Sequence, residues 1–134
     1  MQAIITQFQA MKLFAHRAHL DVQGPQFFAD HKALGKFYEA YDAGYDASAE
    51  RCIGLGYKPD LAKIAKEAAE AAAKYPKNRD PKVLFAVLYT HEETLRKLCT
   101  AEMKDASEGT KNLLAQFCDE SEQRCFLIHK RIAA

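Results

Sequence analysis

One long stretch limits the folds open to this chain more than any other feature. From Phe27 to Cys52, mostly apolar and aromatic side chains return at steps of four and three residues, with no proline between them. That spacing is typical of the core-facing stripe of a long α-helix. The stripe consists of Phe27, His31, Leu34, Tyr38, Tyr41, Tyr45, Ser48 and Cys52. We therefore expect a helix from Gln26 to about Leu55, ended by the glycines that follow.

The same stretch carries polar side chains that suit a metal ion. His31 lies within the stripe, whereas Asp46 and Glu50 lie one turn apart on the flank beside it. His31 and Asp46 are fifteen residues apart, which is about 22 Å along a straight helix, so they cannot bind the same ion within one chain. A two-fold axis that sets this helix antiparallel to its copy would bring them together. His19 would join His31, because the Gly24-Pro25 turn folds the preceding helix back.

These residues also form a pattern that resembles a known family. The matching positions are His19, Gly24, Phe27, His31, Asp46, Ala49, Glu50 and Arg51. In this register they resemble the Dps proteins, the miniferritins that protect DNA in starved cells. The resemblance implies an all-α, ferritin-like four-helix subunit in a hollow shell, usually a dodecamer built from two-fold dimers. It also implies that iron is bound by His19 and His31 of one chain and by Asp46 and Glu50 of the next. There Fe(II) would be oxidised by hydrogen peroxide or dioxygen and stored as ferric mineral.

The chain departs from the family pattern at two places. Gly35 replaces an aspartate that the family has four residues after the second histidine, and Leu20 replaces its usual tryptophan. With one carboxylate missing, we expect water to complete the shell around an Fe(II) ion, which accepts both imidazole and carboxylate ligands. Asp42 lies about two turns beyond Gly35 and is too far along the axis to substitute. His16, one turn before His19, is the nearer candidate for an extra ligand.

The remaining helical patterns predict the topology. Helices are expected from Gln2 to about Leu20, and from Pro81 to about Met103 with Asp80 as the N-cap. The last helix is expected to run to the end, capped by either Asp105 or Ser107. Between the second and third long helices, Tyr57–Pro81 contains a short alanine-rich helix capped by Asp60. Up-and-down bundles use short loops, so a connection of this length is a crossover, as in ferritin-like bundles. The 134 residues suit a single domain, 1–134.

Charge and composition exclude several classes of function. The formal net charge is +1, and no lysine-rich tail precedes the first helix, so the sequence disfavours direct DNA binding. No apolar run approaches the roughly 18 residues of a membrane span, and no signal peptide is visible, so we expect a cytoplasmic protein. Cys52, Cys99, Cys118 and Cys125 have no zinc-like spacing, and reduced, buried thiols are expected.

Each candidate ligand also has a simpler explanation. His31 alone would more often be a hydrogen-bonded core histidine, and Asp46 and Glu50 could belong to a solvated face. His91, Glu92 and Glu93 are interpreted as ordinary residues. Two functions remain open: an iron-oxidising and iron-storing shell, and a shell or scaffold that lost catalysis when Gly35 replaced the carboxylate.

Overall fold

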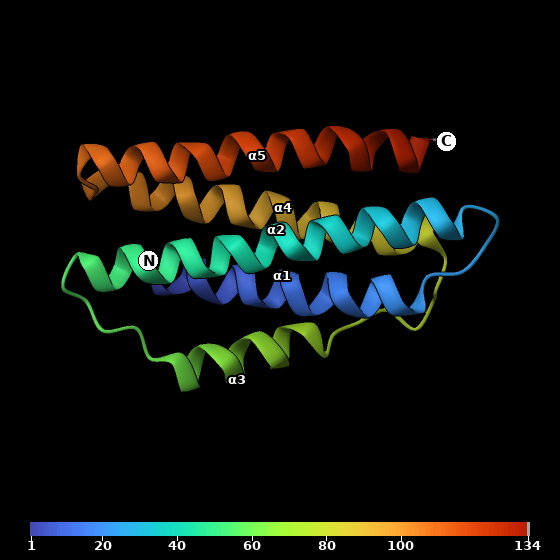
Figure 1. Cartoon of the computed structure of the whole chain (residues 1–134), viewed down its shortest axis with the longest axis horizontal. Helices are drawn as coiled ribbons and strands as arrows, with labels where there is room; N and C mark the ends of the chain where they lie inside the picture. The colour runs from blue at the N-terminus through green and yellow to red at the C-terminus, as the bar shows by residue number, and fades with distance from the viewer. Residues whose placement is uncertain (134) are drawn as a thin grey trace.

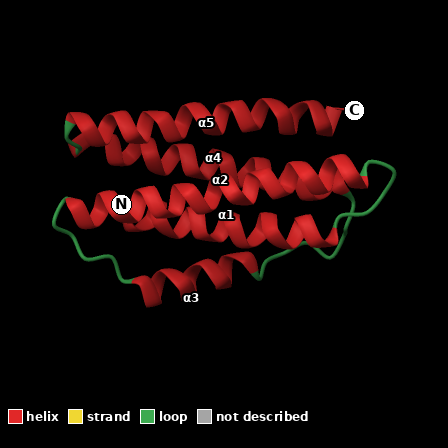
Figure 2. Cartoon of the chain, in the orientation of Figure 1, coloured by secondary structure: helices red, strands yellow, loops and turns green. Residues whose placement is uncertain are grey.

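The computed structural model describes residues 1–133 and is built from helices (Figure 2). The long helices are α1 (Gln2–Asp21), α2 (Phe27–Gly54), α4 (Pro81–Glu102) and α5 (Glu108–Ala133). The short helix α3 (Leu61–Ala72) lies in the connection between α2 and α4, and a 3-10 turn, Met103–Asp105, joins α4 to α5. This architecture confirms the predicted ferritin-like four-helix bundle with one long crossover.

Figure 1 shows how the crossover sets the helix directions. The α1–α2 hairpin and the α4–α5 hairpin each pack as antiparallel pairs, and α1 also contacts α4. Because the crossover runs back along the whole bundle, α4 starts at the end where α2 started, so the two helices are parallel. The helix α3 packs on α1 along the outside of the bundle. His19 and His31 therefore lie at the same end, where α1 ends and α2 begins.

The helix ends are fixed by the residues that the sequence predicts. The Asp60 carboxylate accepts a hydrogen bond from the Lys63 backbone N–H at 3.0 Å, and Asp80 accepts one from Lys82 at 2.9 Å. Both satisfy donors that a helix N-terminus leaves unpaired. Pro81 occupies the first turn of α4, where a missing N–H costs nothing. At α5 the cap is Ser107, whose hydroxyl accepts from the Thr110 backbone at 3.4 Å.

The buried face of α2 is rotated slightly from the predicted stripe. Phe37 and Gly44 are buried, whereas Tyr38 and Tyr45 are only partly covered. The reason is the close approach of α1, since a side chain at Gly44 would overlap the Phe8 ring. At its most buried point the α1–α2 pair therefore packs through Gly44 and Phe8, and the two tyrosines lie at the margin of the contact. The thiols of Cys52, Cys99 and Cys125 are buried, that of Cys118 is partly exposed, and all are free.

Candidate metal centre

His19 and His31 form one compact unit at the end of the α1–α2 hairpin. Their imidazole rings stack with centroids 3.6 Å apart and planes 19° apart. His19 Nδ1 lies 2.6 Å from the backbone oxygen of His31, and His31 Nδ1 lies 2.6 Å from that of His19. Because a carbonyl oxygen only accepts, each Nδ1 must carry the proton and donate. The turn thus ties the last turn of α1 to the first turns of α2 through two reciprocal hydrogen bonds.

This pairing leaves one nitrogen of each ring without a partner from the pair. With the proton on Nδ1, the neutral imidazole keeps its lone pair on Nε2. A hydrogen bond from the non-ligating nitrogen to a carbonyl is the usual way in which proteins orient a metal-binding histidine. Both histidines are partly exposed rather than sealed in the core. The arrangement can therefore present two imidazole nitrogens to an ion at the surface of the subunit.

Aromatic residues extend the histidine stack on both sides. Phe27 stacks on His31 with centroids 5.1 Å apart, and Tyr38 lies edge-on to His19 at 5.7 Å. His16 is exposed, and its ring stacks on Tyr38 at 4.7 Å and lies 6.2 Å from His19. These neighbours restrict the orientations of His19 and His31. They also place His16 beside the pair, as its spacing predicts.

Gly35 lies directly beneath the His19 ring. A Cβ at this position would lie 3.0 Å from His19 Cε1 and 3.1 Å from its Nδ1. The predicted departure from the family pattern therefore has a steric counterpart, because the missing side chain leaves the space that His19 fills. Asp42, the carboxylate farther along the same helix, forms an ion pair with Lys12 at 2.8 Å. It is engaged with α1 rather than with the histidines.

The two acidic candidates do not meet the histidines within one chain. Asp46 and Glu50 are exposed in the second half of α2, and that helix runs unbroken from Phe27 to Gly54. Within residues 1–133, no group of three or more His, Cys, Asp or Glu side chains is close enough to hold a metal ion. One subunit therefore presents two imidazoles at one end of α2 and two carboxylates toward the other.

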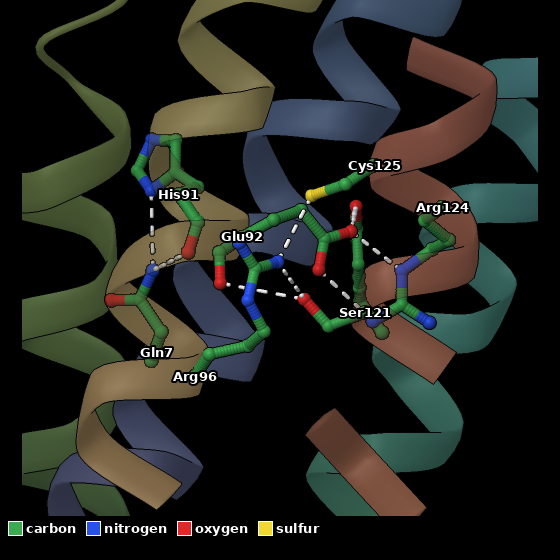
Figure 3. Close-up of polar contacts among 8 residues, drawn as sticks. Gln7, His91, Glu92, Arg96, Ser121, Arg124 and Cys125 are labelled. Carbon is green, nitrogen blue, oxygen red and sulfur yellow. Dashed lines mark hydrogen bonds and ion pairs between the residues drawn. The ribbon is translucent and has the colours of Figure 1, made fainter. Parts of the chain in front are cut away.

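A second polar cluster lies in the centre of the bundle, where sequence reasoning placed ordinary residues. Glu92 of α4 is completely buried, and Arg124 of α5 binds it through Nε to Oε2 at 2.5 Å and Nη2 to Oε1 at 3.0 Å (Figure 3). The Tyr41 hydroxyl donates to Glu92 Oε2 at 2.6 Å. Burial, followed by the charge of Glu92, raises the pKa of Tyr41 well above its ordinary value, while Arg124 lowers it. Tyr41 therefore stays protonated and serves as a donor.

The cluster continues along α4 and α5. Arg96 Nη1 donates to Ser121 Oγ at 2.9 Å and to Cys125 Sγ at 3.0 Å (Figure 3). Ser121 in turn donates to the Glu92 backbone oxygen at 3.4 Å. The sequence does hold a signal for it, because Glu92 continues the four-residue spacing of the buried Leu84 and Leu88. The interpretation of Glu92 as an ordinary residue did not include its burial in an ion pair.

Comparison with known proteins places the chain in a family. The family described as the ferritin-like domain matches residues 6–126, which is most of the chain. The chain belongs to the Dps/ferritin-like family. It is 40% identical over 55 residues to a protein of Helicobacter pylori (strain J99 / ATCC 700824) named DNA protection during starvation protein. That match covers 40% of this chain and 38% of the relative, so the chain spans well under half of the relative's length.

In the ferritin-like family, the centre of the bundle is a place where metal can be bound. Proteins of the ferritin-like family generally bind iron, and the di-iron members hold it in the bundle core with glutamates and a Glu-x-x-His motif on facing helices. In this Dps/ferritin-like chain the core carboxylate Glu92 instead faces the guanidinium of Arg124. A fixed positive charge already neutralises that carboxylate.

Two further observations concern the whole subunit. Members of the Dps/ferritin family typically form homo-oligomers. No helix within residues 1–133 combines the length and the apolar character needed to cross a membrane.

Proposed function

We propose that this chain is a Dps-like protein that binds Fe(II) at a site shared between two subunits, oxidises it and stores the ferric product inside a homo-oligomeric shell. The observation that carries the proposal is the His19–His31 pair. Its two Nδ1–H groups are held by backbone oxygens, which leaves both Nε2 atoms for a ligand. Imidazole and carboxylate together suit Fe(II), and Asp46 and Glu50 of a partner subunit would supply the carboxylates.

The division of ligands within one chain supports the shared site. His31 and Asp46 are about 22 Å apart along an unbroken α2, so each subunit holds half of a donor set. An isologous contact would place residue i opposite residue j and residue j opposite residue i. Two copies of α2 packed antiparallel would therefore form two complete sites related by the two-fold axis. The dimers would assemble further into a hollow shell, with a dodecamer as the family's usual size.

The reaction needs no acid or base beyond the iron and its oxidant. One hydrogen peroxide takes an electron from each of two ferrous ions and, with two protons, leaves as two waters. Dioxygen would take one electron from each of two ferrous ions and, with two protons, leave as hydrogen peroxide. The chain's residues bind the ions and hold them while they change oxidation state, and the metal supplies the redox chemistry. Removing Fe(II) and peroxide together would limit the formation of hydroxyl radicals in the cytoplasm, where the free thiols of this chain stay reduced.

A specific observation favours a second candidate, a shell or scaffold without ferroxidase activity. Gly35 contributes no carboxylate to the histidine side of the site, and the His19 ring fills the space above it. A donor set with fewer carboxylates holds Fe(II) less strongly and stabilises Fe(III) less. The two candidates share the fold and the assembly and differ only in chemistry.

Anaerobic titration with Fe(II), followed by addition of hydrogen peroxide, separates the two candidates. The ferroxidase proposal predicts saturable Fe(II) binding and a ferric absorbance that grows faster than in buffer without protein. His31→Ala and the pair Asp46→Asn/Glu50→Gln should abolish that excess. Asp42→Asn serves as the matched control, because it removes an exposed α2 carboxylate that pairs with Lys12. Oxidation no faster than the protein-free rate, in a correctly assembled protein, would leave only the scaffold.

A further inference from the structure

A groove with an apolar floor runs between α2 and α5, and neither candidate histidine is among the residues that line it. The helix α2 packs mainly on α1 and α5 mainly on α4, so the seam between α2 and α5 is only loosely closed. A cavity of about 490 Å³ lies in that seam. Its floor contains the buried side chains of Phe37, Phe85 and Ile128. This groove is therefore a preformed apolar surface, open to solvent, at the end of the bundle where α2 begins.

The rim of the groove on the α2 side is positively charged. Lys32 and Lys36 lie one turn apart and are exposed. Within residues 1–133, no carboxylate lies close enough to pair with either amino group. The cation on the opposite wall, Arg131, is already held by Asp30 through bonds of 2.8 and 3.0 Å. The positive charge that remains free to pair with a bound helix is therefore that of Lys32 and Lys36.

The lysines alternate with small side chains along the same wall. Ala29 and Ala33 line the groove beside them, and small residues let the backbone of a second helix come close. An α-helix lying in such a groove would bury its apolar side against the phenylalanines. Its acidic side would face the lysines, as in other complexes that hold a helix in a groove. The expected occupant is a helix with an acidic and aromatic face.

The chain itself carries a helix face of that kind. On α5, Asp119, Glu122 and Phe126 lie three and four residues apart and so share one face; we name this set the α5 edge. Phe126 is 59% exposed, and Lys130 lies 5.8 Å from its ring. In the described part of the chain, neither acid of the α5 edge has a cationic partner. Two acids separated by about 4.5 Å along the axis, with a phenyl ring one turn further, complement the groove in charge and polarity.

We propose that the groove between α2 and α5 receives the α5 edge of a second copy of this chain. This inference rests on the proposed shell and identifies a contact that the shell needs. The groove and the α5 edge are different surfaces, so the contact is heterologous, and in a closed shell its rotation must complete a ring. The contact at the metal site is isologous and by itself gives only dimers. Together the two kinds of contact close a shell.

Charge reversal followed by charge exchange tests the contact by light scattering. Lys32→Glu/Lys36→Glu and, separately, Asp119→Lys/Glu122→Lys should each reduce the particle to the mass of a two-fold dimer. The quadruple variant with both pairs exchanged should regain the mass of the wild-type particle. Lys97→Glu/Lys104→Glu, at exposed positions of α4 and of the 3-10 turn that follows it, makes the same change in charge and should leave the mass unchanged. Circular dichroism confirms that each variant is helical. If Lys32→Glu/Lys36→Glu fails to fold, the mass of the Asp119→Lys/Glu122→Lys particle alone tests the contact.

The outcomes separate this contact from the proposed function. A wild-type monomer would overturn the shell and this contact together. A wild-type shell whose mass survives both reversals would overturn the contact alone and would point to an acidic segment of a different protein as the groove's ligand. If the quadruple variant stays dimeric while both reversals disrupt the shell, the direct pairing of these charges is wrong. Under the proposal, the Asp119→Lys/Glu122→Lys dimer still binds Fe(II) but retains no mineral after gel filtration.

Discussion

The His19 imidazole lies on the backbone of Gly35, so close that a Cβ there would be 3.0 Å from its Cε1. The position at which the sequence pattern predicts a missing carboxylate is thus also a position whose lack of a side chain makes room for the His19 ring. This relationship makes position 35 informative about both structure and chemistry.

Gly35→Ala tests the packing part of that relationship. In an open helix position, glycine to alanine stabilises a protein by about 1 kcal/mol. At position 35 the His19 ring must shift by a few tenths of an ångström, and we expect that crowding to offset the gain. Gly109→Ala is the control, since the nearest atom to its added Cβ is 3.8 Å away. Urea unfolding gives the change in the free energy of unfolding for each variant. An equal stabilisation by the two substitutions would show that the His19 ring does not crowd a side chain at position 35.

Gly35→Asp tests the chemical part. We expect faster oxidation of Fe(II) than in Gly35→Ala, because both variants add a Cβ and only the aspartate adds a ligand of the kind that iron prefers. Stopped-flow absorbance after addition of peroxide gives the two rates. If assembled Gly35→Asp and Gly35→Ala oxidise iron equally fast, the missing carboxylate is not what limits this site.

The buried Glu92–Arg124 pair is expected to stabilise the fold in a way that depends on both partners. Arg124→Met leaves a buried carboxylate without its guanidinium, so we expect a loss of about 3 to 5 kcal/mol. Glu92→Met/Arg124→Met removes both charges and should recover most of that loss, since an apolar replacement of a buried pair is often neutral. Urea unfolding of the variants measures this. A double variant as unstable as Arg124→Met would mean that packing, not charge, makes the pair important.

His91 should make the fold sensitive to mild acid. Burial lowers the pKa of His91, while the charge of Glu92 acts in the opposite direction. A lowered pKa means that, as the pH falls below the ordinary value of about 6.5, the unfolded chain takes up a proton before the folded chain does. The free energy of unfolding is therefore expected to decrease from pH 7.5 toward the lowered pKa.

His91→Gln removes the titrating group and should flatten this dependence. Gln7 Nε2 lies 3.3 Å from His91 Nδ1 and donates to the His91 backbone oxygen at 3.2 Å, so the variant keeps a polar neighbour. Urea unfolding at several pH values compares the slopes for the two proteins. Identical slopes would show that His91 does not cause the loss of stability.

Local chemistry made much of this fold predictable. The caps Asp60 and Asp80 act within three residues of themselves, and the length of the crossover alone indicated the topology. The proximity of His19 and His31 followed from the Gly24-Pro25 turn. These features depend on neighbours along the chain, which a sequence displays directly.

Other features depend on how helices rotate against distant partners. Glu92 is paired with Arg124, 32 residues away on another helix, and no local pattern indicates which arginine a buried acid will meet. The reciprocal hydrogen bonds of the histidines and the closeness of Gly35 to His19 depend on a rotation of α2 relative to α1. Sequence spacing gives that rotation only to within a residue, as the burial of Phe37 in place of Tyr38 shows.

Mixing two inactive chains tests the shared metal site most directly. His19→Ala/His31→Ala removes one half of the ligands and Asp46→Asn/Glu50→Gln removes the other, so neither variant alone should oxidise Fe(II) above the protein-free rate. In an equal mixture co-assembled from unfolded chains, half of the dimers are mixed and each mixed dimer has one intact site. We therefore predict recovery of about a quarter of the wild-type activity. Correctly assembled mixed particles with no recovered oxidation would contradict a site built from two subunits.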